Sequence, residues 1–257
     1  MPSLTNSHAT DERLGAKSTA GNGSLTPVEP YALLTGALEF SLASLILEYP
    51  TREVVLTLVE LQESDSCAPA LLALASACRA GLRHVQVAYA ALFEGVQSKV
   101  SLYETEHGVM RGAAKGKDLA DIAGFYRAFG LTPNEENAHE MLDHIAVELE
   151  FYSQLLIRQS ALATARDAEG CEIVEDARRK FLHGHLGRFA GVIAKQPAVQ
   201  ECPVYGPALA WCAALVQLEC ERLRVEPPPL DFFPLRETSE EEAMCGAVHL
   251  PILQSAP

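Results

Sequence analysis

The apolar residues of this chain recur every three to four positions along most of its length, which is the spacing of amphipathic helices. A Thr26-Pro27-Val28-Glu29 capping box, with proline at the first helical position, predicts the start of the first helix. That helix should end before Pro50, and Thr51 should open a second one. The apolar stripe of the first helix consists of Leu34, Leu38, Leu42, Leu45 and Ile46.

A third helical region, rich in alanine and leucine, is predicted from about residue 68 to 95, with a break near Gly81. The next segment, 96–117, lacks a helical period and carries the sequence Leu102-Tyr103-Glu104-Thr105. Loops of this length inside a compact domain tend to be functional or disordered. The aromatic and apolar residues in it favour a functional loop.

Beyond this loop, Asp118 should cap a helix over 119–129, which the following glycine ends. A second capping box, at 132–135, should begin a long helix that contains residues 142–152. After a break near Glu169-Gly170, the last helices are predicted at 172–194 and 205–223.

No segment alternates as a strand would, so the predicted fold class is all-α: a single-domain bundle of roughly eight to ten helices with a long functional loop. Residues 1–25, rich in Ser, Thr, Gly and Asn, should form a disordered arm. The helical domain then spans 26–225. A Pro-rich and acidic tail, 226–257, follows it, with a candidate docked patch at Leu230, Phe232 and Phe233.

The net charge of −14 argues against a nucleic-acid binder, which needs a basic face, and suits a basic partner. The seven cysteines form no C-x-x-C pair and fall mostly within helical patterns, which indicates free thiols in a reducing compartment. We find neither a signal peptide nor an 18-residue apolar run. The sequence therefore predicts a cytoplasmic protein without stable membrane insertion.

The stretch 142–152 places polar groups on a helix that its apolar residues predict to be largely buried. Asp143, His144, Glu148 and Glu150 are costly there unless something pairs with them. The spacings His139 to Asp143 and His144 to Glu148 could bring metal ligands together, but no third ligand is evident. Hydrogen-bonded pairs four residues apart are the favoured interpretation, and no metal is predicted.

Other motifs carry less chemistry. Arg178-Arg179 superficially matches a twin-arginine export signal, but it lies mid-chain in an amphipathic helix with no apolar run after it. His183 and His185 should lie on different sides of that helix, and we treat them as surface residues. Phosphate-binding and acyl-transfer motifs are absent, so neither a nucleotide site nor a catalytic nucleophile has motif support.

Tyr103 and Glu104 in the loop, together with Asp143 and His144, allow two interpretations. These residues could meet to form a polar-walled groove whose carboxylates capture a peptide with arginines. Alternatively, Asp143 and His144 only tie the loop to the helix and hold the fold. The residues by themselves leave both interpretations open.

Several linked segments resemble the TorD/DmsD/NarJ family of molybdenum oxidoreductase chaperones. Asp143-His144 followed by Glu148-Leu149-Glu150-Phe151 resembles the family's D-H-x-x-x-E-L-E-F region, and Tyr103-Glu104-Thr105 its P-Y-E-S/T segment. The helix at 119–131 and the Y-x-x-L-F pattern at 89–93 also fit. The form of these segments is most similar to the branch for dimethylsulfide, ethylbenzene, selenate and chlorate oxidoreductases. Leu142 and Ser101 stand where the family commonly has proline.

The resemblance implies a non-enzymatic, cytoplasmic chaperone without a cofactor. Its partner would be the catalytic subunit of a molybdopterin oxidoreductase, held by its twin-arginine leader or N-terminal region until the cofactor is inserted before export. The implied peptide-binding residues are Asp143, His144, Tyr103, Glu104 and Glu148. A homodimer is compatible with this fold, although no feature demands one. The alternatives are a GTP-binding regulatory switch, a small-molecule enzyme on an all-α scaffold, or a helical adaptor without leader specificity.

Overall fold

The computed structural model describes residues 29–63, 67–94, 98–108, 115–131 and 141–230. Within these ranges the chain forms ten α-helices and two short 3-10 helices, and its only extended pairing is an isolated bridge. The all-α prediction is therefore confirmed. The six cysteines in these ranges are all free, and Cys78, Cys212 and Cys220 are buried, as expected for small core residues.

Two long antiparallel helices, α1 (Pro30–Leu47) and α6 (Ile145–Thr164), form the centre of the bundle. The Ser160 hydroxyl donates to the Pro30 carbonyl and the Ser153 hydroxyl to the Ala37 carbonyl, both over 2.8 Å. Each serine hydroxyl is buried between the two helices, and its hydrogen bond to the carbonyl of α1 satisfies it there. Seven residues separate the two contacts on each helix, so the pair stays in register over two turns.

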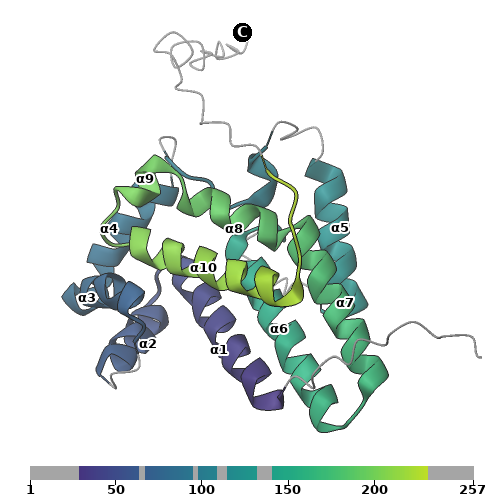
Figure 1. Ribbon diagram of the computed structural model, residues 1–257. Helices are drawn as coiled ribbons and strands as arrows, with labels where there is room; N and C mark the ends of the chain where they lie inside the picture. The colour runs from purple at the N-terminus through teal and green to yellow at the C-terminus, as the bar shows by residue number, and fades with distance from the viewer. Residues whose placement is uncertain (1–28, 64–66, 95–97, 109–114, 132–140, 231–257) are drawn as a thin grey trace, which may run out of the picture.

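Four elements form one side of the bundle (Figure 1). The Thr51 hydroxyl caps α2 (Arg52–Glu63) by accepting from the Val54 amide, as predicted. The 3-10 turn η1 (Pro69–Leu71) leads into α3 (Leu72–Ala80), and α4 (Leu82–Phe93) follows. The predicted break lies at Gly81, whose φ of 125° is a conformation that favours glycine.

The opposite side is formed by α5 (Lys115–Ala128) and α7 (Ala168–Gly184) (Figure 1). In the view of Figure 1, α10 (Gly206–Leu223) crosses in front of α1 and packs on α8 (Leu186–Ala194). The short α9 (Pro197–Gln200) lies between the two predicted helices 172–194 and 205–223, where no helix was predicted. After α10 the chain crosses the start of α8 (Figure 1), and Leu230 packs against the core.

Several predicted boundaries are wrong. Glu29 has extended backbone, so α1 begins at Pro30 and the first capping box does not form as predicted. Helix α5 begins at Lys115, which places Asp118 inside its first turn. Glu169-Gly170 belong to the first turn of α7, and the predicted helix 172–194 is interrupted at His185. The arm 1–25, the capping box 132–135 and the tail beyond Leu230 lie outside the described residues.

The apolar stripe predicted for the first helix is the outer side of α1. Leu34 is 43% exposed and Leu38 73%, Leu42 and Leu45 are half-buried, and of the five only Ile46 is buried. Because α1 is apolar on both sides, its periodicity does not indicate which side packs. The side that packs on the core consists of Leu33, Ala37, Phe40, Ala43 and Leu47.

Candidate functional site

The end of the long loop docks on the start of α6, which brings the predicted site residues together. Tyr103 and His144 form an antiparallel bridge, and the Glu104 amide donates to the Asp143 carbonyl over 2.9 Å. The Ile145 amide donates to the Leu102 carbonyl over the same distance. The predicted meeting of loop and helix is therefore present.

Asp143 and His144 do not lie on a helix, as the sequence pattern predicted. They form the turn before α6, which begins at Ile145. His144 is the N-cap residue, and its Nδ1 accepts from the Ala146 amide over 3.2 Å. In the neutral ring the proton therefore lies on Nε2. The ring also meets the edge of the Tyr103 ring, with centroids 5.1 Å apart.

The Asp143 carboxylate is completely buried and anchors the loop. Its Oδ2 accepts from both the amide and the hydroxyl of Thr105, over 3.1 Å and 2.6 Å. The second hydrogen bond has the short length typical of a hydroxyl on a charged acceptor. Its Oδ1 has no hydrogen-bond partner among the described residues. This geometry holds the loop against α6, and no side-chain atom of Asp143 is left at the surface.

A buried histidine connects this loop to α5. His185 Nδ1 lies 3.0 Å from Glu104 Oε2, and His185 Nε2 lies 3.1 Å from Asp121 Oδ2. Burial opposes protonation of the ring, but the hydrogen bonds and charges of the two carboxylates outweigh it and raise the pKa of His185. The His185 ring, bonded to two carboxylates, ties η2 (Glu104–Glu106), α5 and the break between α7 and α8 into one unit.

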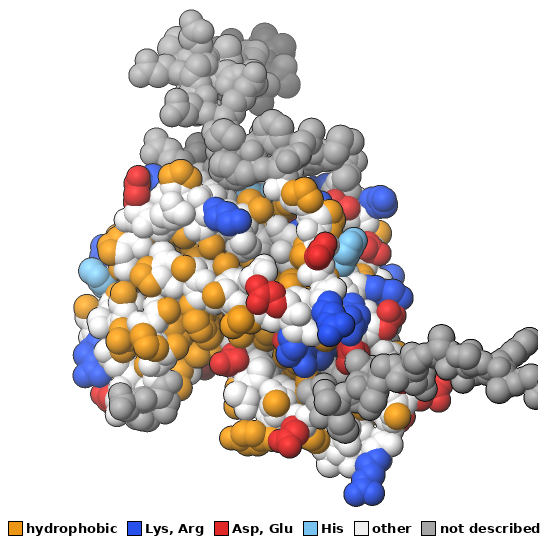
Figure 2. Space-filling view, in the orientation of Figure 1, with side chains coloured by type: hydrophobic (Ala, Val, Ile, Leu, Met, Phe, Trp, Pro, Cys, Tyr) orange, Lys and Arg blue, Asp and Glu red, His pale blue; other side chains and the backbone are white. Residues whose placement is uncertain are grey.

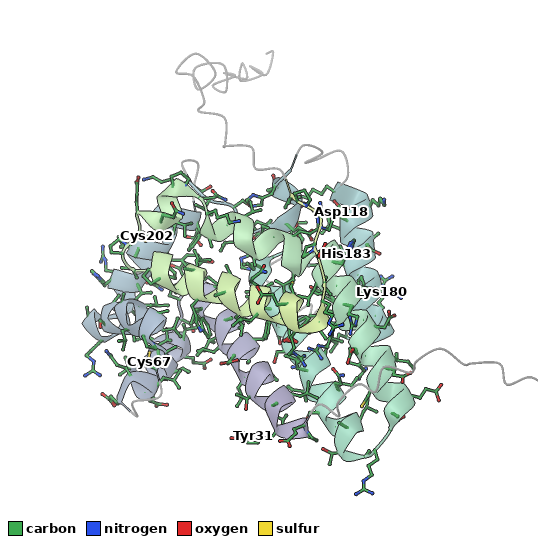
Figure 3. All side chains as sticks on the ribbon, in the orientation of Figure 1. Tyr31, Cys67, Asp118, Lys180, His183 and Cys202 are labelled. Atoms are coloured by element: carbon green, nitrogen blue, oxygen red, sulfur yellow. The ribbon has the colours of Figure 1, made fainter. Side chains whose placement is uncertain are left out.

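His185 is the site residue that the sequence analysis missed, because we placed it at the surface. His183 is exposed, as predicted, and lies on the outside of α7 (Figure 3). The signal was present in the sequence: two histidines on different sides of a helix cannot both face solvent when the other side packs. Phe181, Leu182 and Leu186 around His185 are all buried.

Glu148 lies on the first turn of α6 and is completely buried beneath the loop. Burial raises the pKa of its carboxyl well above the ordinary value, and the charges of Glu104 and Asp143 raise it further. The surroundings therefore favour the neutral form of this side chain. Glu150, two residues later, is exposed, whereas Asp143 and Glu148 are both buried.

Only some of the acidic groups around this network are accessible. The side chain of Asp121 is 66% exposed and that of Glu106 is 46% exposed, where it pairs with Lys115 over 2.8 Å. Tyr103 is half-buried. The accessible groups of the site are thus the Tyr103 ring, two carboxylates and the Lys115 ammonium that pairs with one of them, whereas Asp143, His144, Glu104 and Glu148 are buried. Such a surface can bind a cation or guanidinium group.

A hollow of about 460 Å³ lies between α5, α6 and α7, beside this network. Its apolar lining includes Phe125, Phe129, Leu162 and Val174. Lys180 at its rim pairs with Asp176 over 2.7 Å. Among the described residues no group of three His, Cys, Asp or Glu side chains could hold a metal ion.

The chain matches known proteins over the region that contains the site. The family model described as nitrate reductase delta subunit matches residues 61–195. Over 151 residues the chain is 30% identical to the chlorate reductase assembly chaperone protein of Ideonella dechloratans, covering 57% of this chain and 74% of that protein. Over 150 residues it is 30% identical to the selenate reductase assembly chaperone protein of Thauera selenatis, with the same coverage.

Proposed function

Because the chain belongs to the nitrate reductase delta subunit family, we propose that it binds the leader or N-terminal region of a molybdenum-containing catalytic subunit. It holds that subunit in the cytoplasm for cofactor insertion before export. The resemblance to TorD, DmsD and NarJ proteins drawn from the sequence is confirmed at the level of the family. The two relatives carry names that describe assembly rather than catalysis, which agrees with a non-enzymatic role for this chain.

One observation supports the proposal most: the loop and the start of α6 form a single buried polar network with acidic groups at its exposed end. The exposed groups, Asp121 and Glu106, suit the paired arginines of a leader, because carboxylates accept from guanidinium groups in a bidentate manner. Tyr103 offers a ring for stacking on the same surface. A net charge of −14 attracts such a peptide over a longer range.

In this proposal the five predicted peptide-binding residues have two roles. Tyr103 contacts the leader directly. The buried side chains of Asp143, His144, Glu104 and Glu148 hold the loop in the binding conformation, so they are positioning residues. The two interpretations of Asp143 and His144, peptide capture and holding the fold, then describe one mechanism.

Calorimetry with variants separates these roles. Asp121→Asn should weaken binding of a twin-arginine leader peptide several-fold and lower the melting temperature less than Asp143→Ala does, because the asparagine oxygen can still accept a hydrogen bond from His185. Asp143→Ala should weaken binding and also cost about 1–3 kcal/mol of stability, because the Thr105 donors lose their acceptor. Glu63→Gln on α2, whose side chain is 60% exposed, is the matched control for Asp121 and should change neither property.

The client is identified by affinity purification of the tagged protein from its native host grown with molybdate. Recovery of a large molybdopterin subunit that still bears its leader supports the proposal. If no such subunit is recovered under enzyme-inducing conditions and the leader peptide does not bind, the proposal is wrong. Calorimetry with GTP then tests the nucleotide-switch alternative.

A further inference from the structure

Helix α1 carries a row of apolar residues on its outer face that is most exposed to solvent in its N-terminal half. Tyr31 is 79% exposed, Leu34 43% and Leu38 73%, and the half-buried Leu42 and Leu45 continue the row. At 100° per residue these five positions fall within an arc of about 80°. Tyr31 lies at the N-terminal end of α1 and points away from the bundle (Figure 3). Leu42 and Leu45 pack partly against the core, and α10 crosses α1, so the exposed part of the row is its N-terminal half.

The outer face of α1 is unusually apolar for a surface. The helix has the length and composition of a segment that could cross a membrane, yet only 39% of its residues are buried. Hydrophobic side chains gather to the left of α1, beside a hollow in the outline of the molecule (Figure 2). Scattered exposed leucines are normal on proteins, but a continuous apolar row marks an interaction surface.

The charges around the outer face of α1 indicate what covers it. Residues 29–49 contain three glutamates, Glu29, Glu39 and Glu48, and no lysine, arginine or histidine. All three glutamates are exposed. On α1 itself, an apolar segment that docks here meets acidic residues and no basic residue, so a segment with basic flanks fits best.

The same charges disfavour three other occupants. A second copy of this chain would bring three more glutamates and another −14 of net charge to the interface. A membrane surface carries anionic headgroups, and helices that lie on it usually have basic polar faces. The chain's own tail places the acidic run 240–242 before its apolar end. Only a basic-flanked apolar segment avoids this repulsion.

We propose that the outer face of α1 binds the apolar stretch of the client's leader, while the basic residues of the leader lie near the glutamates. This inference rests on the proposed function and adds a second contact surface to it, separate from the loop site. Tyr31 and Leu45 are fourteen residues apart, so the face is about 21 Å long. A helical apolar segment of about fourteen residues covers that length, which suits the apolar region of a leader.

The test is calorimetric titration of the full-length protein with a synthetic peptide that has two arginines followed by about twelve apolar residues. Leu38→Gln and Leu34→Gln should each weaken binding about tenfold, and both variants should keep the wild-type melting temperature because both side chains are exposed. The matched control is Val87→Gln on α4, where Val87 is 61% exposed, and it should bind the peptide as the wild type does. A second peptide, with its apolar residues replaced by serine, should bind the wild type and Leu38→Gln equally weakly.

The outcomes separate this inference from the proposed function. If the wild type binds the peptide and Leu38→Gln binds it equally well, the α1 surface is wrong and the proposed function stands. If the wild type binds neither peptide, both are wrong. Light scattering that shows a dimer in the wild type and a monomer in Leu38→Gln would overturn the inference in favour of a second copy. Binding of the wild type, but not of Leu38→Gln, to vesicles of anionic phospholipid would overturn it in favour of a membrane.

Discussion

Arg178 and Arg179 are neighbours on α7 in opposite environments. Arg178 is completely buried and donates to Tyr152, Gln159 and Glu219. Its guanidinium also lies 5.4 Å from the centre of the Tyr152 ring. The side chain of Arg179 is 38% exposed and pairs with Glu175 one turn earlier. The first arginine therefore holds α6, α7 and α10 together, and the second adds a partly exposed ion pair and a hydrogen bond to the Leu223 carbonyl at the end of α10.

Arg178→Ala is expected to destabilise the protein by about 3 kcal/mol, because it leaves the partners of a buried cation without their donor. Arg179→Ala should cost less, about 1 kcal/mol, because it loses one partly exposed ion pair and one hydrogen bond to the Leu223 carbonyl. Urea unfolding followed by circular dichroism measures both. If both variants lose a similar amount of unfolding free energy, the burial of Arg178 does not determine how much this residue stabilises the protein.

The buried carboxyl of Glu148 makes stability depend on pH. The pKa of this acid is raised in the folded state above its ordinary value of 4.5, so the folded protein binds the proton more tightly than the unfolded chain. Its contribution to stability is complete below that ordinary value and is lost as pH rises through the raised pKa. His185, whose pKa is raised from 6.5, acts in the same direction.

Glu148→Gln should therefore flatten the fall in unfolding free energy that begins as the pH rises above the ordinary carboxyl pKa of 4.5. One proton accounts for up to about 1.4 kcal/mol per pH unit. The readout is urea unfolding at a series of pH values. The exposed Glu150→Gln, two residues away, should retain the wild-type slope. If Glu148→Gln retains that slope too, the carboxyl is not protonated in the folded protein.

At the scale of single residues, the sequence identified which groups meet but not how they are oriented. The motif placed Tyr103 and Glu104 beside Asp143 and His144, and the structure confirms that they meet. The start of α6 was not predictable from periodicity, because His144 serves as N-cap through a ring nitrogen rather than through the usual short polar side chain. The sequence pattern could indicate that His185 is buried but not what it contacts, because its partners, Glu104 and Asp121, are distant in sequence.

Helices and their breaks were predicted where a local residue sets them. Gly81 and Gly130 both have positive φ and lie at predicted helix ends. The break between α7 and α8 has no such local signal. It follows from tertiary contacts, since His185 leaves helical geometry, with φ −130° and ψ −99°, and bonds to two other elements. The same limit applies to α1, where both faces are apolar and packing selects one.

Gly187, just after this break, has a specific packing requirement. A Cβ at this position would lie 2.3 Å from the Leu182 carbonyl oxygen and 2.8 Å from Pro227 Cγ. The missing side chain lets the end of α7 and the segment after α10 approach α8 closely. Because the carbonyl belongs to the backbone, it cannot move aside as a flexible side chain would.

Gly187→Ala is thus expected to destabilise the protein by about 1–3 kcal/mol through overpacking. Gly191 lies one turn later on the same helix, and a Cβ there would meet nothing within 4 Å. Gly191→Ala should be neutral or stabilising by about 0.5–1 kcal/mol, because alanine restricts the unfolded chain. Thermal unfolding of the pair tests this contrast. Equal effects of the two substitutions would mean that the Leu182 carbonyl and the segment after α10 move aside for the new methyl group without a loss of stability.

At the scale of the whole molecule, charge separates what brings a client to the protein from what holds it there. The net charge of −14 acts over about a Debye length and attracts a leader with two arginines before any contact forms. The proposed contacts at Asp121 and on α1 act only after docking. Salt should therefore affect arginine recognition strongly and apolar contacts weakly.

Raising the salt concentration from about 50 mM to about 500 mM should weaken binding of the twin-arginine leader peptide by about tenfold, because screening shortens the reach of these charges. A peptide with both arginines changed to glutamine should bind more weakly at low salt and respond little to added salt. Calorimetry across the salt series measures both. Because the α1 contacts are apolar, the effect of Leu38→Gln should stay the same at every salt concentration. If the twin-arginine peptide binds equally well at every salt concentration, charge does not select the client. The acidic groups around His185 then stabilise the fold and have no part in binding.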